Sequence, residues 1–468
     1  EFDEPEAEDL EERLLSRFLT ALNGGGGRPA LSPNRLFNEY GTHLVTKIYL
    51  GGRLEYWFSS DKVASMTAAE FQISVEAAYS AVSGAPDVAL GNGNKYTAEA
   101  VDMTLDVVGG ESVAMAKLEG DSDTFVEWVA TIPGHAHYIG RPENSLIAIW
   151  DFCDDPQRAA RLKAAYDAAR AKGIVERPVL FTNSALMPKG VLEVEVTVPK
   201  GYKVLSGGAR VNTPHCPLVF SYPTSGGRGW VARAQHHLYE HFSGRLTVSV
   251  LAIYDPEDYY DVVMVSKECK ESAQYPLAQI GVPSGYQLTG GGSRTKTMGH
   301  GNFVWMSHPT YRSSSRSFAL LTNHHSVTAE EINNLYRYRL GRPQRIEGWI
   351  AISRDHGVVS VAKVTAFAIG IKPAEKFKNV MLHTRVFTKD SSTSTNPRSH
   401  IRPDAGYTLV GGGGMTTAAP TLLTASSPEY ATDGAGGLAW YVESQEHNNP
   451  GSASAYAFAV GLKVLVAR

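Results

Sequence analysis

The sequence predicts an α+β chain in which an N-terminal part mixes helices with strands and a C-terminal part is all β. Glycine supplies 45 of 468 residues, about 10% against an average of ~7%, and charged residues only 20% against ~25%. Helical patterns concentrate in the first 175 residues, and the C-terminal half repeats itself three times. We expect one domain over residues 1–186 and a second over 187–468.

Two helices are predicted in the N-terminal part. Residues 9–22, DLEERLLSRFLTAL, carry apolar side chains at helical spacing, and a run of four glycines follows as a breaker. Residues 155–172, DPQRAARLKAAYDAARAK, combine an early proline with alanine-rich propensity, and Gly173 lies just beyond them. Between these helices, residues 35–58 alternate as strands.

Residues 70–82, EFQISVEAAYSAV, fit two periodicities at once. Apolar residues alternate as in a strand of about eleven residues, close to the ~9–11 of a transmembrane β-strand, but they also form a helical stripe. The run AVDMTLDVV at 100–108 alternates as well, and a turn-rich segment separates the two runs. The pattern predicts either a surface helix followed by a half-buried core strand, or an amphipathic membrane hairpin. The candidates for the membrane face of that hairpin are Phe71, Ile73, Val75, Ala77, Tyr79, Ala81, Val101, Met103, Leu105 and Val107.

The C-terminal repeats share four elements. Each opens with a glycine-rich strand, continues with an apolar strand and a glycine-led strand, and closes with a further strand. The openings are GYKVLSGGAR at 201–210, GYQLTGGGSR at 285–294 and GYTLVGGGGM at 406–415, and the apolar strands begin at Pro217, Ala319 and Thr421. We expect repeats at about 187–266, 275–372 and 400–466, with insertions in the middle copy that include NFVWMSHPTYRSSS. Three such sheets are predicted to pack around a pseudo-threefold axis as a β-prism or trefoil.

Charge and hydropathy exclude several classes of protein. The net charge of −4 without a long basic run argues against a nucleic-acid partner. No stretch approaches the ~18 apolar residues of a spanning helix, and the acidic N-terminus is unlike a signal peptide. Cys153, Cys216 and Cys269 are too few for a disulfide framework, although one bridge with a free thiol stays open.

One motif points to a different chemistry. His237-Leu-Tyr-Glu240-His241 spells the inverted zinc-protease sequence H-x-x-E-H, which needs a helix to align its two imidazoles. The motif falls where the repeats predict a connection between strands. The sequence also lacks a phosphate-binding G-x-x-x-x-G-K-[ST], a G-x-S-x-G elbow and C-x-x-C. We therefore expect no enzyme, no metal and no cofactor, with a metalloprotease as the alternative.

Two groups of motifs in the N-terminal part carry a resemblance to a known family. Tyr40-Gly41-Thr42-His43, followed by Gly51-Gly52, resembles the signature of the membrane attack complex/perforin (MACPF) family, although Leu44 stands where the family usually has an aromatic residue. Gly109-Gly110 after an apolar strand, and then Trp128, resemble a second family stretch. The resemblance covers roughly residues 10–175.

The resemblance implies a MACPF domain with a bent antiparallel central sheet and flanking helical clusters. It implies that a secreted, soluble monomer binds a lipid membrane, assembles into a homo-oligomeric ring and converts helical clusters into pore-lining hairpins. Residues ~59–100 would then be the second cluster, and Gly109 and Gly110 are hinge candidates. The first cluster should precede the signature by well over the forty residues present, so we expect the domain to be incomplete at its N-terminal side.

A MACPF domain followed by a threefold β-rich domain resembles pleurotolysin-type and bacterial insecticidal MACPF toxins. This resemblance implies that the C-terminal domain recognises a receptor glycan, a lipid or a partner protein. Phe303, Trp305 and Tyr311 are candidates for that contact, since amphipathic rings favour interfaces, although they could equally cap the sheet. The alternative function is a non-lytic β-prism adhesin or lectin.

Overall fold

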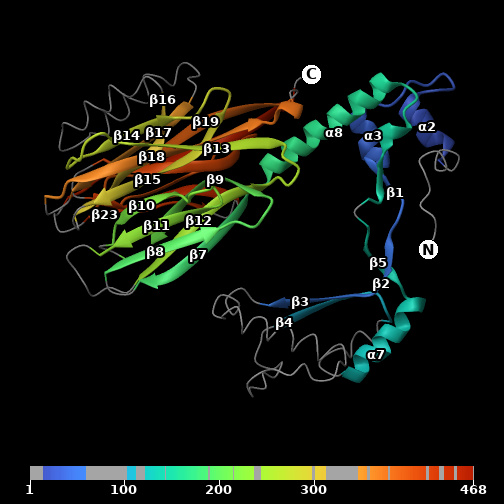
Figure 1. Ribbon diagram of the computed structural model, residues 1–468, viewed down its shortest axis with the longest axis horizontal. Helices are drawn as coiled ribbons and strands as arrows, with labels where there is room; N and C mark the ends of the chain where they lie inside the picture. Colours follow the sequence, from blue (N-terminus) through green and yellow to red (C-terminus); the bar gives the residue numbers. More distant parts are fainter. Residues whose placement is uncertain are drawn as a thin grey trace. The chain divides into compact units, whose positions relative to one another are not determined.

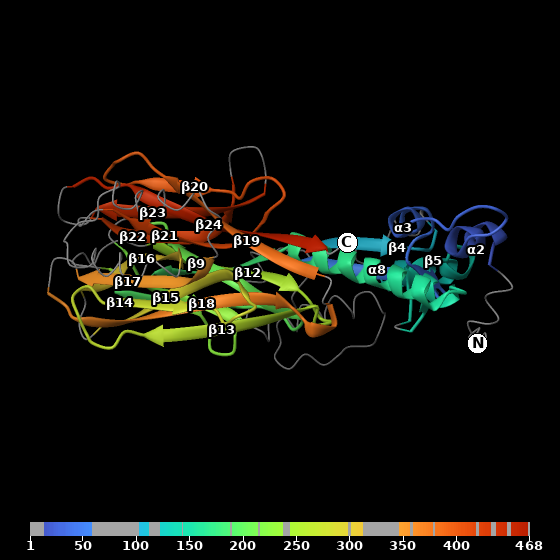
Figure 2. The same cartoon turned by 90° about the horizontal axis from the view of Figure 1, so that it is seen from above.

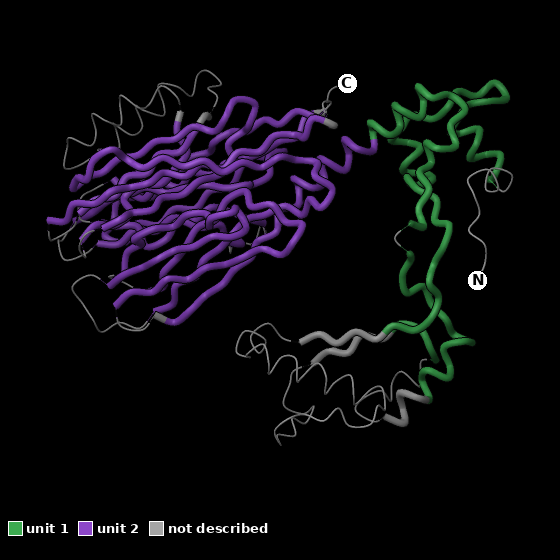
Figure 3. Tube along the Cα trace, in the orientation of Figure 1, with its two compact units in different colours: residues 1–165 green, residues 166–468 purple. Residues whose placement is uncertain are grey.

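The computed structural model describes two compact units, residues 1–165 and 166–468 (Figure 3). The described residues are 14–58, 103–111, 122–311 and 346–466, apart from 143, 188–189, 214–215, 237–243, 298–300, 356–358, 378–379, 418–420, 432–436 and 447–450. None of the helices in these ranges is both long and apolar enough to cross a membrane.

The strands described in the first unit pair two by two (Figure 1). The sheets are β1 (His43–Val45) with β6 (Leu146–Ala148), β2 (Tyr49–Gly51) with β5 (His137–Gly140), and β3 (Arg53–Phe58) with β4 (Met103–Val108), all antiparallel. The helices are α2 (Ser16–Asn23), α3 (Pro33–Tyr40), α7 (Ser122–Thr131) and α8 (Pro156–Glu176), with short 3-10 turns η2 (Ile132–Gly134) and η3 (Ile149–Phe152).

Both predicted helices are present, with different ends. The first is described from Ser16 to Asn23, and its predicted start lies outside the described residues. The second continues past Gly173 to Glu176. The proline two residues later explains this end, because the residue before a proline is disfavoured in helical conformation.

The first unit has its buried core around α2, α3, η3 and the start of α8. This core contains Phe18, Leu22, Leu36, Ile149, Phe152 and Leu162. The Arg158 guanidinium crosses it, donating from Nε to the Leu22 carbonyl at 2.7 Å and from Nη2 to the Leu31 carbonyl at 2.5 Å. These bonds satisfy carbonyls where the α2–α3 connection packs against α8.

The second unit consists of three six-stranded antiparallel sheets (Figures 1 and 2). Its eighteen described strands form three sets of six along the chain. The first set is β7 (Val179–Met187), β8 (Val191–Thr197), β9 (Tyr202–Val211), β10 (Leu218–Pro223), β11 (Gly229–Gln235) and β12 (Gly244–Tyr254). The second is β13 (Tyr260–Glu268), β14 (Leu277–Gly281), β15 (Gln287–Thr297), β16 (Asn302–Tyr311), β17 (Ile346–Asp355) and β18 (Ala362–Pro373). The third is β19 (Val380–Asp390), β20 (Arg398–Ile401), β21 (Thr408–Thr416), β22 (Thr421–Tyr430), β23 (Leu438–Glu446) and β24 (Ala455–Val466).

Every one of these sheets is shared by two sets of strands. The sheet orders are β13-β18-β15-β10-β11-β8, β20-β23-β22-β9-β12-β7 and β14-β17-β16-β21-β24-β19. Each pair of sets therefore shares one sheet. The first and second sets form one sheet, the first and third sets form another, and the second and third sets form the remaining sheet. The strands thus close in a cycle, as three equivalent repeats permit.

Glycine-rich β9, β15 and β21 explain the strongest repeat signal in the sequence. A Cβ added at Gly290 would collide with the Ser206 side chain, and one added at Gly411 would collide with the Thr289 carbonyl. The three strands therefore approach one another so closely that no side chain fits at Gly290 or Gly411 beside Ser206.

The same hydrogen bond occurs in all three repeats. A buried tryptophan donates from Nε1 to a serine Oγ across the strand pair. The pairs are Trp230 to Ser221 at 2.8 Å, Trp349 to Ser307 at 2.9 Å and Trp440 to Ser426 at 3.1 Å. Each serine is the first residue of a Ser-x-Pro sequence. This shared sequence was not used when the three repeats were aligned with one another.

One element of the middle repeat was predicted wrongly. β16, part of the stretch predicted as an insertion, takes the place of β10 and β22, because Pro309 lies opposite Trp349 as Pro223 lies opposite Trp230. The apolar run at Ala319 lies outside the described residues. The additional chain of this repeat therefore falls between β16 and β17. The predicted domain boundary at 186 stays a prediction.

Candidate functional site

The sequence Tyr40–His43 forms the junction between α3 and β1. Tyr40 is the last residue of α3 and packs edge-on against Phe18, with ring centroids 5.3 Å apart. Gly41 has φ +79° and ψ −169°, a conformation that strongly favours glycine. His43 Nδ1 lies 3.0 Å from Thr42 Oγ1, and its ring meets Trp150 edge-to-face at 5.3 Å. This part of the motif therefore has packing and hydrogen-bonding contacts.

The two predicted glycine pairs meet at the end of the β3–β4 ladder. The last register pair is Arg53 with Val108, and the chain then turns through Gly109 at φ +82° and Gly110 at φ +78°. A Cβ added at Gly109 would collide with the Gly51 carbonyl and lie 3.1 Å from Gly52 Cα. We call Gly51, Gly52, Gly109 and Gly110, together with Trp128 that contacts them, the glycine corner.

Trp128 closes this corner from α7. Its side chain is buried, and its Nε1 donates to the Gly109 carbonyl at 2.8 Å. A Cβ added at Gly52 would lie 2.8 Å from Trp128 Cζ2, and one at Gly110 would collide with the indole nitrogen. A side chain at either glycine would therefore displace the indole or move the strand.

Backbone and hydroxyl bonds connect the corner to the chain that follows Trp128. Thr131 Oγ1 donates to the Trp128 carbonyl at 2.7 Å and accepts from the Glu111 amide at 2.9 Å. The Gly110 amide donates to the His135 carbonyl at 3.0 Å. The end of the β3–β4 ladder is thus held by hydrogen bonds to α7 and to the residue that follows η2, and the hinge role of Gly109 and Gly110 stays a prediction.

The predicted hairpin residues are only partly described. Met103, Leu105 and Val107 occupy alternate positions of β4, paired in register with Phe58, Tyr56 and Leu54 of β3. Phe71, Ile73, Val75, Ala77, Tyr79, Ala81 and Val101 lie outside the described residues. The membrane role of all ten stays a prediction.

Two of the three predicted receptor contacts are core residues. Phe303 is 1% exposed and packs with Val219 and Leu422, and Trp305 is 2% exposed with the Arg354 guanidinium over its ring at 5.0 Å. The prediction was wrong for these two, because β16 is a central strand of its sheet. Tyr311 ends that strand, and a contact role for it stays a prediction.

The described residues contain no candidate metal site. Within the ranges given above, no group of three or more His, Cys, Asp or Glu could hold a metal ion. The His237–His241 motif falls outside those ranges.

Comparisons with known proteins bear on the N-terminal part. The family model of the MAC/Perforin domain matches residues 14–152, which contain both glycine pairs and Trp128. Among solved structures, the chain is similar to the crystal structure of GNIP1Aa from Chromobacterium piscinae, with 17% identity and a TM-score of 0.31. That match covers 60% of this chain and 54% of that one, about half its length, and its low TM-score establishes no common fold. No curated protein matched.

Proposed function

We propose, from the premise that residues 14–152 form a domain of the MAC/Perforin family, that this protein forms pores in membranes. A secreted, soluble monomer attaches to a lipid membrane through its second unit, a β-prism. Copies then assemble into a ring, and the segments 70–82 and 100–108 insert as an amphipathic hairpin. The protein acts without enzymatic chemistry and without a cofactor.

The glycine corner is the observation that carries this proposal. Insertion requires the β3–β4 ribbon to extend and to change its direction at the root. The four glycines allow such a change because no Cβ obstructs it. Trp128 and Thr131 supply a small number of bonds that hold the root until insertion.

The narrow sheets of the first unit support assembly between copies. Among the described strands, β1–β6 and β2–β5 form two-stranded sheets whose outer edges can accept another strand. Large apolar side chains on or beside them are exposed: Val45, Ile48, Tyr49, Leu50 and Tyr138. Edge pairing between copies would bury such residues.

The experiment is release of an encapsulated dye from liposomes, with rings sought by negative-stain microscopy. In Gly110→Ala, the new Cβ restricts the backbone conformations through which the ribbon root must pass, so we expect dye release to fall at least tenfold. Gly134→Ala is the matched control in the same unit, because no atom lies within 4 Å of the added Cβ, and it should release dye as the parent does.

An engineered disulfide can distinguish a variant that folds but cannot insert residues 70–82 from a variant that does not fold. One cysteine is placed in 70–82 and one in the central sheet outside the β3–β4 ribbon, after Cys153, Cys216 and Cys269 are replaced. Oxidised protein should bind liposomes without releasing dye, and reduction should restore release. Full release with the bridge verified by mass spectrometry would contradict insertion of this segment.

The same dye-release assay distinguishes a pore-forming protein from the alternative, a non-lytic adhesin. The alternative predicts tight binding to cells or glycans and no dye release from any liposome that the protein binds.

A further inference from the structure

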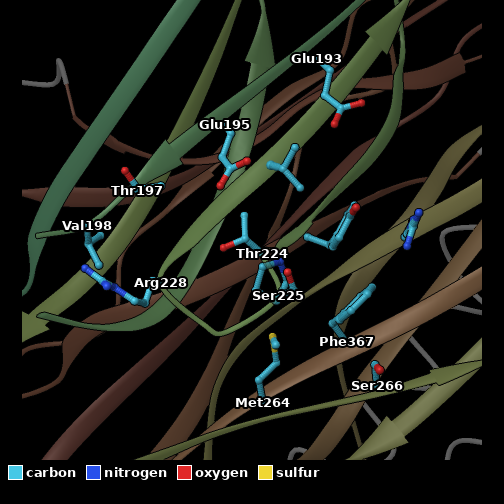
Figure 4. Close-up of a pocket in the computed structure, with 14 residues that line it drawn as sticks. Glu193, Glu195, Thr197, Val198, Thr224, Ser225, Arg228, Met264, Ser266 and Phe367 are labelled. Atoms are coloured by element: carbon cyan, nitrogen blue, oxygen red, sulfur yellow. The ribbon is translucent and has the colours of Figure 1, made fainter. Parts of the chain in front are cut away.

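The sheet formed by β13, β18, β15, β10, β11 and β8 carries a groove of about 810 Å³ on one face. Its lining comes from all six strands of the sheet and from the β10–β11 turn, so the groove runs across the strands. Figure 4 shows Glu195, Thr197 and Arg228 on one side, Phe367 and Ser266 on the other, and Thr224 and Ser225 between them. An adjoining hollow of about 640 Å³ shares Arg228 and Met264.

An aromatic pair forms the apolar part of the groove. The rings of Tyr222 and Phe367 stack with centroids 4.9 Å apart and an interplanar angle of 18°. The Arg294 guanidinium lies over the Tyr222 ring, 5.4 Å from its centroid. Both aromatic residues are partly exposed. The remaining lining is mainly hydroxyl and charged groups.

Besides the Arg294 guanidinium over the Tyr222 ring, two charged side chains in the groove form no ion pair with a described residue. Within the described part of the chain, neither the Glu195 carboxylate nor the Arg228 guanidinium makes an ion pair, whereas neighbouring Glu193 accepts from Arg233 at 2.6 Å. Glu195 can therefore accept hydrogen bonds from a ligand, and Arg228 can donate them.

The other two sheets fill the equivalent position. By strand register, His308 and Ser427 correspond to Tyr222, and Phe458 and Ser249 correspond to Phe367. His308 stacks on Phe458 at 4.5 Å, and all four of these residues are buried. The opening at Tyr222 and Phe367 is therefore specific to one face and does not follow from the repeated fold.

We propose that this groove binds a neutral oligosaccharide chain. A pyranose ring presents apolar C–H groups on its faces and hydroxyls around its rim, which matches an aromatic pair set among carboxylate, guanidinium and hydroxyl groups. The groove crosses several strands at ~4.8 Å spacing, a length that suits several sugar units rather than one. The inference rests on the proposed attachment role of the second unit and names its ligand.

A peptide suits the groove less well. An extended peptide is usually held by the free backbone groups of a sheet edge, but this groove lies on a face where those groups are already paired within the sheet. An apolar helix would need a broad apolar surface, and the groove has a single aromatic pair with a few aliphatic side chains.

The test is isothermal titration calorimetry of the 468-residue chain, without membranes, against five hexasaccharides. They are linked hexamers of α-1,4-glucose, β-1,4-glucose, β-1,3-glucose, β-1,4-mannose and β-1,4-N-acetylglucosamine. At least one should bind with a Kd below about 1 mM. Phe367→Ala, Arg228→Ala and Glu195→Gln should each weaken that binding about tenfold or more, roughly 1.4 kcal/mol.

Lys389→Ala is the control, because it removes an exposed cation on another sheet, and it should leave the Kd unchanged. Arg228 and Glu195 are exposed, so their variants test the groove even if Phe367→Ala does not fold. Binding by none of the five sugars, or binding that survives both Arg228→Ala and Phe367→Ala, would overturn the inference. Dye release from liposomes is measured separately, so the inference can fail while pore formation stands, and the reverse.

Discussion

The two units of this chain stabilise their strands in opposite ways. In the second unit, every described strand belongs to a six-stranded sheet that two repeats share, and a buried Trp–Ser bond recurs three times. In the described part of the first unit, strands pair only two by two, and one tryptophan closes the glycine corner. Since isolated two-stranded sheets are marginal in water, we expect the first unit to open locally well before the second.

The largest effect is expected when one of the three repeated tryptophans is replaced by alanine. Trp230→Ala, Trp349→Ala and Trp440→Ala each remove a fully buried indole, and each should lower the free energy of unfolding of the second unit by about 3–5 kcal/mol. Chemical denaturation of the full chain, with hydrogen exchange assigning the transition, measures these losses. A cost below about 1 kcal/mol at one site would refute energetic equivalence of the repeats.

Acid should weaken the second unit through His308. Burial lowers the pKa of His308 to about 4, against about 6.5 in an unfolded chain. Between these values the unfolded chain binds a proton that the folded one does not, so stability is complete above pH 6.5 and falls towards pH 4, by ~3 kcal/mol. His308→Gln should flatten this pH dependence of the unfolding free energy, and exposed His400→Gln should leave it unchanged.

Removing the indole donor should loosen the first unit alone. Trp128→Phe keeps an aromatic ring but leaves the buried Gly109 carbonyl without the Nε1 bond, which costs about 2 kcal/mol. The Gly110 amide should then exchange with solvent roughly thirtyfold faster, while amides of β9, β15 and β21 keep their rates. Equal acceleration in both units would mean that the two do not open independently.

The smallest expected effect concerns the serine acceptors. Ser221→Ala, Ser307→Ala and Ser426→Ala each leave a buried indole N–H without its bond, which costs about 1 kcal/mol. Denaturation midpoints of the three single variants measure this, with exposed Ser225→Ala as the control. Three unequal shifts would show that the repeats keep a common geometry without a common energy.

The repeated strands of the second unit and the family segment of the first could be predicted from the sequence, because both depend on the positions of glycines. The glycine-rich strands stood out because their backbones approach one another closely, which leaves no room for a side chain at Gly290 or Gly411, and the spaced glycine pairs lie in the segment that the family model matches. Strand pairing could not be predicted, because β9 pairs with β22 more than two hundred residues away, and no local pattern encodes that choice. The prediction that Phe303 and Trp305 are exposed was wrong for the same reason. Their burial depends on which strands surround β16.

The groove also lay beyond sequence reasoning. Tyr222, His308 and Ser427 occupy one repeated position, but only register in the folded sheets aligns them. Once the Ser-x-Pro sequences are used to align the repeats, the variation at this position can be read from the chain itself.

The sharing of sheets between repeats constrains how this chain can be made. One sheet joins β7, β9 and β12 of the first repeat to β20, β22 and β23 of the third. On a ribosome adding ~5–20 residues per second, the first strands therefore wait on the order of ten seconds for their partners. During that interval their apolar faces have no native cover, so slow elongation or a premature stop should favour capture by chaperones over folding.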